Sequence, residues 1–310
     1  MTSLNTLTGV APIIPTPFLA DEQIDFEGVA ACVRFAVERR LPAVCLPAYA
    51  SEFYKLSESE RVQCVETAIT AAAGRTAIVA QANHPSARHA AETAKRYEAL
   101  GASAISFAIP RLFSLPERDL LDYCTTICRA VRLPILIQDF NPGGPTVGAD
   151  FARRLMETCD NFKYLKLEES LMSGKIRSIV AATEGRIGVL EGWGGMFMLE
   201  LIPAGICGVM PGLGVSDLLA RIWHDYATGN AHAALQRFQI VLPQIVFALQ
   251  NSELFNWIEK RLLRARGVLS DRNIHVRGAT WTPDEATLRY GDWLNEQIVR
   301  GAPDLSQGES

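Results

Sequence analysis

Eight short apolar runs alternate with longer stretches of helical period, and this alternation constrains the fold more than any other feature of the sequence. It is typical of repeated β-strand and α-helix units around a parallel sheet. No G-x-G-x-x-G turn follows the first run, which weakens the alternative of an open, dinucleotide-binding sheet. We therefore predict a (β/α)8 TIM barrel over residues 1–214, with strands at 10–14, 43–46, 77–80, 104–108, 135–138, 162–167, 187–190 and 206–210.

Helical periods fill the stretches between these runs and continue alone after Pro211. Within the barrel, we predict helices at 26–40, 58–73, 87–100, 116–131, 149–158 and 170–182. A C-terminal helical extension is expected over 215–300, with helices at 215–227, 231–249, 253–266 and 283–300. Residues 301–310 are polar and contain Gly and Pro, so we expect a flexible tail.

The composition indicates a globular protein with a small-molecule partner. Its net charge of −4 provides no basic field to hold a nucleic acid or an anionic membrane surface. Residues 1–8 lack the pattern of a signal peptide, and no apolar stretch reaches the ~18 residues of a spanning helix. We therefore expect a cytoplasmic protein without a nucleic-acid or membrane partner.

The seven cysteines are odd in number and scattered through predicted strands and helices, which indicates reduced thiols. Cys124 and Cys128 lie one helical turn apart, but no second Cys or His pair follows at the spacing of a zinc site. No carboxylate and histidine cluster has metal-ligand spacing either, so we predict no metal.

Lys166 is the strongest candidate for chemistry. Side chains alternate between the two faces of a strand, so in a strand over residues 162–168 Lys166 and Glu168 lie on the face opposite Leu165. We expect this polar face to be the barrel interior. Active sites of barrels lie at the carboxyl ends of the strands, where partial removal from water favours the neutral amine that attacks a ketone. The structural alternative is a buried ion pair of Lys166 with Glu168 or Glu191.

Further support comes from short stretches spread over residues 9–294. They are Pro-Thr-Pro-Phe at 15–18, Glu-Phe-Tyr-Lys-Leu-Ser at 52–57 with Glu60-Arg61, Ala-Leu-Gly-Ala at 99–102, Leu-Pro-Ile-Leu-Ile at 133–137, Tyr-Leu-Lys at 164–166 and Gly-Ile-Cys-Gly-Val-Met-Pro at 205–211. In their order and spacing, these stretches resemble the dihydrodipicolinate synthase and N-acetylneuraminate lyase family.

The resemblance implies a lyase that binds pyruvate or another 2-oxo acid as a Schiff base on the lysine of the sixth strand, here Lys166. It also implies no separate cofactor and a homo-oligomer, a tetramer or a dimer. Aldol-type condensation or cleavage of a C–C bond is the reaction expected first. Dehydration or deamination of a 2-keto-3-deoxy or hydroxylated 2-oxo acid is the alternative through the same imine, and a non-catalytic 2-oxo acid binding or regulatory barrel is the alternative from another class.

The chain departs from the family after the second strand. The family has Gly-Thr-Thr-Gly-Glu there, whereas residues 48–52 read Ala-Tyr-Ala-Ser-Glu. Both threonine hydroxyls are missing, so we expect the backbone N–H groups of Tyr49, Ala50 and Ser51 to hold the substrate carboxylate if the turn keeps its shape. The alternative for Tyr49 is a packing residue that fills the former pocket.

A second departure concerns proton transfer. Gln138 takes the place of the family's proton-shuttling tyrosine, and a carboxamide orients groups but is no acid or base near neutral pH. The proton must then pass through Tyr49, Asp139, Glu168, a water or the substrate. Pro-Arg-Leu-Phe at 110–113 also replaces the family's aromatic pair, so standard dihydrodipicolinate synthesis is not expected.

Loops after other strands supply further candidates. A small residue such as Gly192 allows close approach of the backbone to a ligand, and Trp193 offers a flat wall. Arg111 and His84 are candidates for contacting the substrate, with a solvated loop arginine and a turn histidine as the alternatives. The remaining substrate-binding candidates are Glu191 and Met210.

Overall fold

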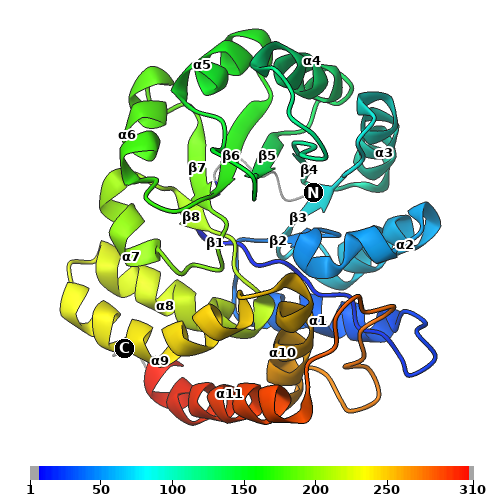
Figure 1. Ribbon diagram of the computed structural model, residues 1–310, viewed down its shortest axis with the longest axis vertical. Coiled ribbons are helices and arrows are strands. Elements are labelled where there is room, and N and C mark those ends of the chain that lie inside the picture. The colour runs from blue at the N-terminus through cyan, green and yellow to red at the C-terminus, as the bar shows by residue number, and fades with distance from the viewer. Residues whose placement is uncertain (1–6, 307–310) are drawn as a thin grey trace.

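The computed structural model describes residues 7–306 and has a parallel barrel at its centre, which confirms the predicted (β/α)8 fold (Figure 1). Eight strands form one sheet in the order β1-β8-β7-β6-β5-β4-β3-β2. They are β1 (Gly9–Val10), β2 (Ala43–Leu46), β3 (Ala77–Gln81), β4 (Ala104–Ala108), β5 (Ile135–Phe140), β6 (Phe162–Glu168), β7 (Gly188–Glu191) and β8 (Gly208–Val209). The helices between them are α1 (Phe26–Glu38), α2 (Glu58–Ala72), α3 (Ala87–Leu100), α4 (Glu117–Cys128), α5 (Ala149–Thr158), α6 (Ser173–Ala182) and α7 (Met198–Leu201).

Isolated pairings close the barrel between β1 and β2. Ile13 bridges to Cys45 at the end of β2, and Cys45 N donates to Pro12 O at 2.9 Å. The strand predicted over 10–14 is in fact only two residues long, because Pro12 has no N–H to continue the ladder.

Glycines allow β1 and β8 to approach. Gly9 pairs with Gly208, and a Cβ at Gly208 would lie 2.3 Å from Gly9 O. A larger residue at this seam would push the strands apart. The eighth strand comprises Gly208–Val209 and is shorter than the predicted 206–210.

Alternation along the strands determines which side chains fill the barrel. The interior is packed by mostly small or aliphatic residues, among them Ala43, Cys45, Ala77, Val79, Leu136, Tyr164 and Leu190. The next inward positions toward the carboxyl ends of β5 and β6 are Gln138 and Lys166, which are paired in the β5–β6 register. Polar side chains therefore follow an apolar layer inside the same barrel.

Local sequence signals explain where the helices begin and end. Ser57 Oγ accepts from Glu60 N at 3.3 Å, and Glu60 Oε2 accepts from Ser57 N at 2.8 Å, so a capping box opens α2. Helix α3 ends at Gly101, whose φ of 98° lies in the left-handed region.

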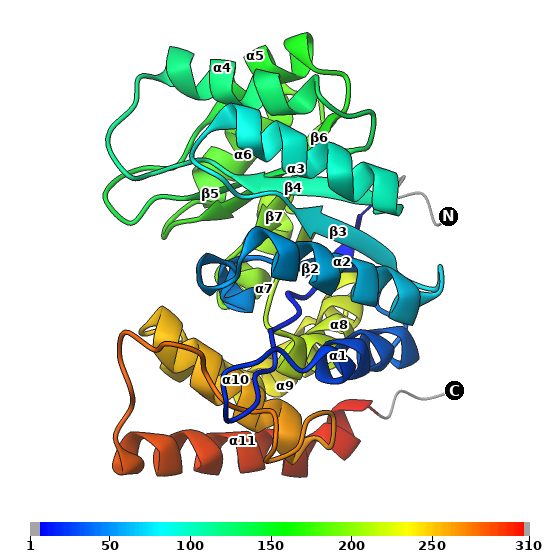
Figure 2. The ribbon, with the colours of Figure 1, turned by 90° about the vertical axis from the view of Figure 1, so that its right-hand side faces the viewer.

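Helices dominate the chain beyond β8: α8 (Ser216–Ala227), α9 (Ala231–Ala248), α10 (Ser252–Ala265) and α11 (Glu285–Ser306). Helix α8 packs against β1, and α9 to α11 form a layer at one side of the barrel (Figure 2). Helix α11 continues past its predicted end at 300, and residues 307–310 of the expected tail lie outside the described residues. Helix α10 also contacts the 3-10 helix η1 (Tyr49–Ser51) after β2, which brings its first turn to the barrel mouth.

Candidate active site

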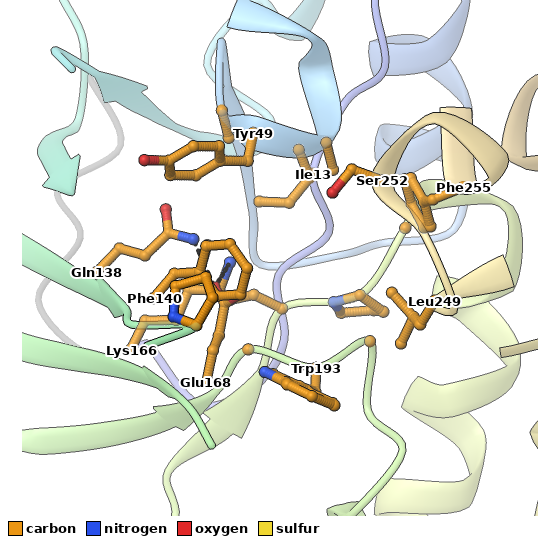
Figure 3. Close-up of a pocket in the computed structure, with 18 of the residues that line it drawn as sticks. Ile13, Tyr49, Gln138, Phe140, Lys166, Glu168, Trp193, Leu249, Ser252 and Phe255 are labelled. Atoms are coloured by element: carbon orange, nitrogen blue, oxygen red, sulfur yellow. Dashed lines mark hydrogen bonds and ion pairs between the residues drawn. The ribbon is translucent and has the colours of Figure 1, made fainter. Parts of the chain in front are cut away.

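A pocket of about 530 Å³ lies at the carboxyl ends of the strands (Figure 3). This is the end of a parallel barrel where the loops after the strands meet and where barrel enzymes place their active sites. The residues that line it include Tyr49, Gln138, Lys166, Glu168, Trp193 and Met210.

Lys166 and Glu168 occupy consecutive inward positions of β6. The Lys166 side chain is only 6% exposed, and its Nζ lies 3.0 Å from Glu168 Oε1. A Cβ at Gly192 would lie 2.6 Å from Lys166 Cε and 2.4 Å from Glu168 Cγ. The backbone at 192 therefore packs against this pair as only glycine allows.

Gln138, on β5, makes two further polar contacts beside Lys166 and Glu168. Its Nε2 donates to Glu168 Oε1 at 2.5 Å, and its Oε1 accepts from Gln81 Nε2 at 2.6 Å. Oε1 of Glu168 thus meets both Lys166 and Gln138. No described residue donates to Glu168 Oε2, so this oxygen is available to a ligand.

Some polar groups of the turn after β2 form hydrogen bonds within the fold, whereas others belong to residues that line the pocket. Ser51 Oγ donates to Ile14 O at 2.6 Å and accepts from Ala48 N at 2.9 Å, while Ser51 N donates to Ala48 O at 3.0 Å. Ser51 is thus fully engaged in the turn. Tyr49 and Ala50 line the pocket, and their N–H groups, at the start of η1, have no intrahelical acceptor.

Tyr49 lies above Gln138 in the pocket (Figure 3). Its ring packs edge-on against Phe140, with centroids 5.8 Å apart. Burial raises the pKa of the Tyr49 hydroxyl, and the nearby charge of Glu168 raises it further. Tyr49 therefore keeps its proton near neutral pH and is suited to donate hydrogen bonds rather than to act as a base.

Asp139 and Arg111 lie away from the pocket. Side chains alternate along β5, so Asp139 points outward while Gln138 points inward. Arg111 Nε donates to Asp139 Oδ1 at 2.9 Å, Arg111 Nη2 donates to Oδ2 at 2.6 Å, and Val147 N donates to Oδ2 at 2.7 Å. The two residues satisfy each other and position the loop after β5.

Glu191 lies behind the pocket wall and is fully buried. Its Oε2 accepts from Gly195 N at 2.7 Å, while its Oε1 has no partner among the described residues. Burial raises the pKa of Glu191 to about 7, against the opposing effect of the backbone N–H groups of Gly195 and Phe197. Glu191 supports the turn whose residues Gly192 and Trp193 line the pocket.

His84 is engaged in its own loop. Its Nδ1 accepts from Ser86 N at 2.9 Å, and its ring lies near that of His89, with centroids 4.8 Å apart. His84 is absent from the described lining of the pocket, whereas Met210 is part of it.

Sequence reasoning missed the outer wall of the pocket, which the turn between α9 and α10 provides. Its lining residues are Leu249, Gln250, Asn251, Ser252, Phe255 and Asn256. The helical period of this segment carries no signal that it folds over the barrel mouth. Gln81 was missed as well, although a polar residue at the end of an apolar run could have drawn attention to it.

Buried ion pairs join this outer wall to the turn after β2. Lys260 Nζ lies 2.5 Å from Glu52 Oε1, and both side chains are fully buried. Lys55 Nζ lies 2.9 Å from Glu52 Oε2 and 2.7 Å from Glu253 Oε2. Burial lowers the pKa of Lys260, which the charge of Glu52 opposes. The first turn of α10 is thereby fixed to the segment that carries Tyr49.

Three further observations concern residues 7–306. All seven cysteines are free. No group of three or more His, Cys, Asp or Glu side chains is placed to hold a metal ion. None of the helices described is both long and apolar enough to cross a membrane.

The sequence profile of the Dihydrodipicolinate synthetase family matches residues 6–275, so the chain belongs to this family. The predicted resemblance is thereby confirmed. The chain is an enzyme of the lyase class that this family comprises.

Relatives within the family differ in activity. An L-2-keto-3-deoxyarabonate dehydratase of Azospirillum brasilense is 27% identical over 272 residues, which are 86% of this chain and 87% of the relative. A 4-hydroxy-tetrahydrodipicolinate synthase of Chlorobium chlorochromatii is 31% identical over 188 residues, 60% of this chain and 63% of the relative. A prophage protein of Escherichia coli K12 from the dihydrodipicolinic acid synthase family, solved in complex with pyruvate, has the same fold, with a TM-score of 0.85 at 21% identity over 94% of this chain and 98% of that one.

The raised pKa of Glu191 predicts a pH-dependent stability. The folded protein binds a proton at Glu191 more tightly than the unfolded chain does, so stability falls as pH rises from about 4.5 to about 7. We expect Glu191→Gln to reduce the fall in the free energy of unfolding between pH 5 and pH 8 by about 2 kcal/mol. Urea unfolding at each pH measures this effect.

Glu66→Gln, which removes one exposed carboxylate from α2, controls for the loss of a negative charge. Equal pH slopes for the wild type and Glu191→Gln would show that the carboxyl at 191 is not held in its neutral form.

Proposed function

We propose that the protein is a Schiff-base lyase of 2-oxo acids in which Lys166 is the reacting amine and Glu168 transfers the proton. The main support is the 3.0 Å contact between Lys166 Nζ and Glu168 Oε1 in a pocket at the carboxyl end of the barrel. Covalent catalysis needs a nucleophile within hydrogen-bond distance of a base. Family membership supports the same chemistry, and the imine requires no separate cofactor.

The first step joins Lys166 to the substrate. Glu168 Oε1 accepts a proton from the ammonium group, and the neutral amine attacks C2 of the 2-oxo acid. The carbonyl oxygen leaves as water, and a C=N bond forms between C2 and Nζ. The protonated imine withdraws electrons from the neighbouring carbon, which makes a proton on C3 easier to remove.

We propose that the imine serves to remove water from a 3-deoxy-4-hydroxy 2-oxo acid. Glu168 takes a proton from C3 to give an enamine, which then expels the C4 hydroxyl group as water with that proton. Water adds to C2 of the remaining unsaturated imine, and the C2–Nζ bond breaks, which regenerates the Lys166 amine and releases the product as a 2-oxo acid. A carboxylate with one free oxygen suits both transfers, whereas the carboxamide of Gln138 exchanges no proton near neutral pH. The similarity over most of the chain to the dehydratase of Azospirillum brasilense supports this choice.

The proposed substrate carboxylate site is the turn after β2. The N–H groups of Tyr49 and Ala50 have no intrahelical acceptor and belong to residues that line the pocket. Successive N–H groups of a turn bind anions without help from side chains. The prediction that Ser51 N–H joins this set is wrong, because Ser51 N donates to Ala48 O and its hydroxyl donates to Ile14 O.

The rest of the pocket fits a neutral hydroxylated tail. Its charged lining residues in the described chain are Lys166, Glu168 and Glu169, and Glu169 Oε1 is paired with Lys175 Nζ at 2.5 Å. Among the described residues, no free cation is thus placed in the pocket to meet a second acid group of the substrate. Asn251, Ser252 and Asn256 on the outer wall have side chains of the kind that hydrogen-bond to hydroxyl groups.

Cleavage of the C3–C4 bond is the second candidate reaction, favoured by the aldolases and synthases of the family. In that case Glu168 would accept the proton of the C4 hydroxyl group, and the electrons of the C3–C4 bond would move to the imine. The products separate the two reactions. Cleavage releases an aldehyde and a shorter 2-oxo acid, whereas dehydration releases one product and water.

Borohydride reduction tests the imine directly. With pyruvate or a 3-deoxy 2-oxo sugar acid, we expect a covalent adduct on the peptide that contains Lys166, read by mass spectrometry. Lys166→Arg should give no adduct and lose at least about 10³-fold in kcat/KM, because a guanidinium forms no imine with a ketone.

Lys163→Arg is the matched control, since Lys163 is an exposed lysine of the same strand. Full activity of Lys166→Arg on a substrate turned over by the wild type would contradict the mechanism. An adduct on Lys166 without turnover of any substrate tried would instead favour the non-catalytic binding role.

A substitution of Glu168 tests proton transfer separately from imine formation at Lys166. We expect Glu168→Gln to lower kcat by about 10²- to 10⁴-fold, because the proton carrier is lost while the amine stays in place. Trapping of pyruvate by borohydride should persist, at a lower rate. A Glu168→Gln enzyme with wild-type kcat would remove Glu168 from the proposed proton transfer.

We further propose that the chain forms a homo-oligomer, a tetramer or a dimer, in the cytoplasm. Leu112, Phe113 and Leu171 follow β4 and β6 and are 72%, 70% and 91% exposed, and exposed apolar groups are typical of surfaces that a second copy covers. Light scattering should give a multiple of the 34.0 kDa chain mass. A mass of one chain would contradict the proposal.

A further inference from the structure

Gln81 is a buried polar residue that touches the proposed catalytic machinery without lining the pocket. Its side chain lies on β3, and alternation from Ala77 and Val79 places it in the barrel interior. It is 2% exposed, and its Nε2 donates to Gln138 Oε1 on β5 at 2.6 Å. The intervening strand β4 leaves room for this contact because Ala108, paired with Gln138 in the register, is small.

The two amides form a chain of hydrogen bonds with one direction. Cys45 Sγ lies 3.9 Å from Gln81 Oε1, Gln81 Nε2 donates to Gln138 Oε1, and Gln138 Nε2 donates to Glu168 Oε1. A carboxylate only accepts, so Gln138 must turn its NH2 group toward Glu168. Its carbonyl oxygen then faces β3 and needs a donor, which Gln81 provides.

This direction determines what Glu168 can do. Gln138 is a donor to Oε1 only while its amide keeps this orientation. A reversed amide would present a carbonyl oxygen to the carboxylate, and two acceptors within hydrogen-bond distance repel each other. Glu168 would then turn away from Gln138 and lose its position beside Lys166, which removes the proposed base from the amine.

We propose that Gln81 is a positioning residue that fixes the amide of Gln138 and thereby keeps Glu168 Oε1 in place beside Lys166. The inference rests on the proposed function, because it assigns Glu168 the proton transfer. Gln81 itself touches neither the substrate nor the reacting amine.

Two substitutions separate positioning from packing. Gln81→Met keeps a side chain of similar length without a donor, so kcat should fall about tenfold, the effect of about one net hydrogen bond, with little change in KM. Gln81→Glu presents an acceptor while ionised but donates an O–H to Gln138 Oε1 once protonated. Its kcat relative to the wild type should therefore be low at pH 8 and recover toward pH 5.

Other titratable groups near these amides must be taken into account. They are Cys45 from β2, Tyr49 from η1, Lys166 and Glu168 from β6 and Glu191 from β7. Burial raises the pKa of Cys45 to about 12 and raises that of Tyr49, so both keep their protons over this range. Glu191 titrates in all variants, and the ratio to the wild type at each pH removes its effect.

The control is Gln63→Met, the same substitution at an exposed position of α2. Wild-type kcat and pH profiles in both Gln81 variants would overturn the inference, as would a Gln81→Glu ratio that does not rise with falling pH. If Gln81→Met does not fold, the Gln81→Glu profile decides alone. Loss of the folded state in Gln81→Glu, read by circular dichroism, also overturns it, because the role would then be structural.

Borohydride trapping distinguishes failure of the proposed function from failure of the positioning role of Gln81 alone. If the wild type gives no adduct on Lys166, the proposed function fails. If it gives the adduct and turns substrate over while the Gln81 variants behave as the wild type does, only the positioning role fails.

Discussion

The contact between Lys166 and Glu168 inside the barrel is the interaction on which the rest of the site depends. A charge withdrawn from water is costly unless a partner of opposite sign lies beside it and its remaining hydrogen bonds are made. The barrel meets this requirement with neighbours from three directions. Glu168 faces the lysine from the same strand, Gln138 donates from β5, and the bare backbone of Gly192 leaves room for both side chains. The Glu168 carboxylate, which stabilises the buried amine of Lys166, is thus also the proposed base beside it.

Much of the fold could be predicted because the periodicities are strong. The strands at 43–46 and 104–108 and the helices at 87–100 and 149–158 were predicted with the observed bounds. The predicted bounds were wrong at β1 and β8, which are both two residues long; Pro12 ends β1, because it has no N–H to donate. These limits arise from single backbone groups, which a hydrophobic period does not record.

From the apolar pattern alone, the candidate site could be predicted only where a charge interrupts it, and the pocket residues Tyr49, Gln138 and Met210 needed the family resemblance. Lys166 stands out for this reason, whereas the neighbours Gln138 and Asp139 follow a run that is apolar on both faces. When a strand is buried on both sides, its sequence does not show which residues point into the barrel. Gln138, which points inward, could therefore not be told from Asp139, which points outward. The outer wall is harder still, since the contact of Lys260 with Glu52 joins positions far apart in the chain that no local pattern relates.

The reacting groups and the residues that contact the far end of a ligand come from different segments of the chain. The groups assigned to bond making and proton transfer lie on β6, while the residues that meet the far end of a ligand come from the segment at the start of α10 and the turn before it. Substitutions at lining positions such as Ser252 and Phe255 can therefore change the preference for chain length or stereochemistry without touching the reactive amine, provided that Glu253 keeps its ion pair with Lys55. Such changes need few simultaneous substitutions, because these lining side chains lie on a different segment of the chain from Lys166 and Glu168.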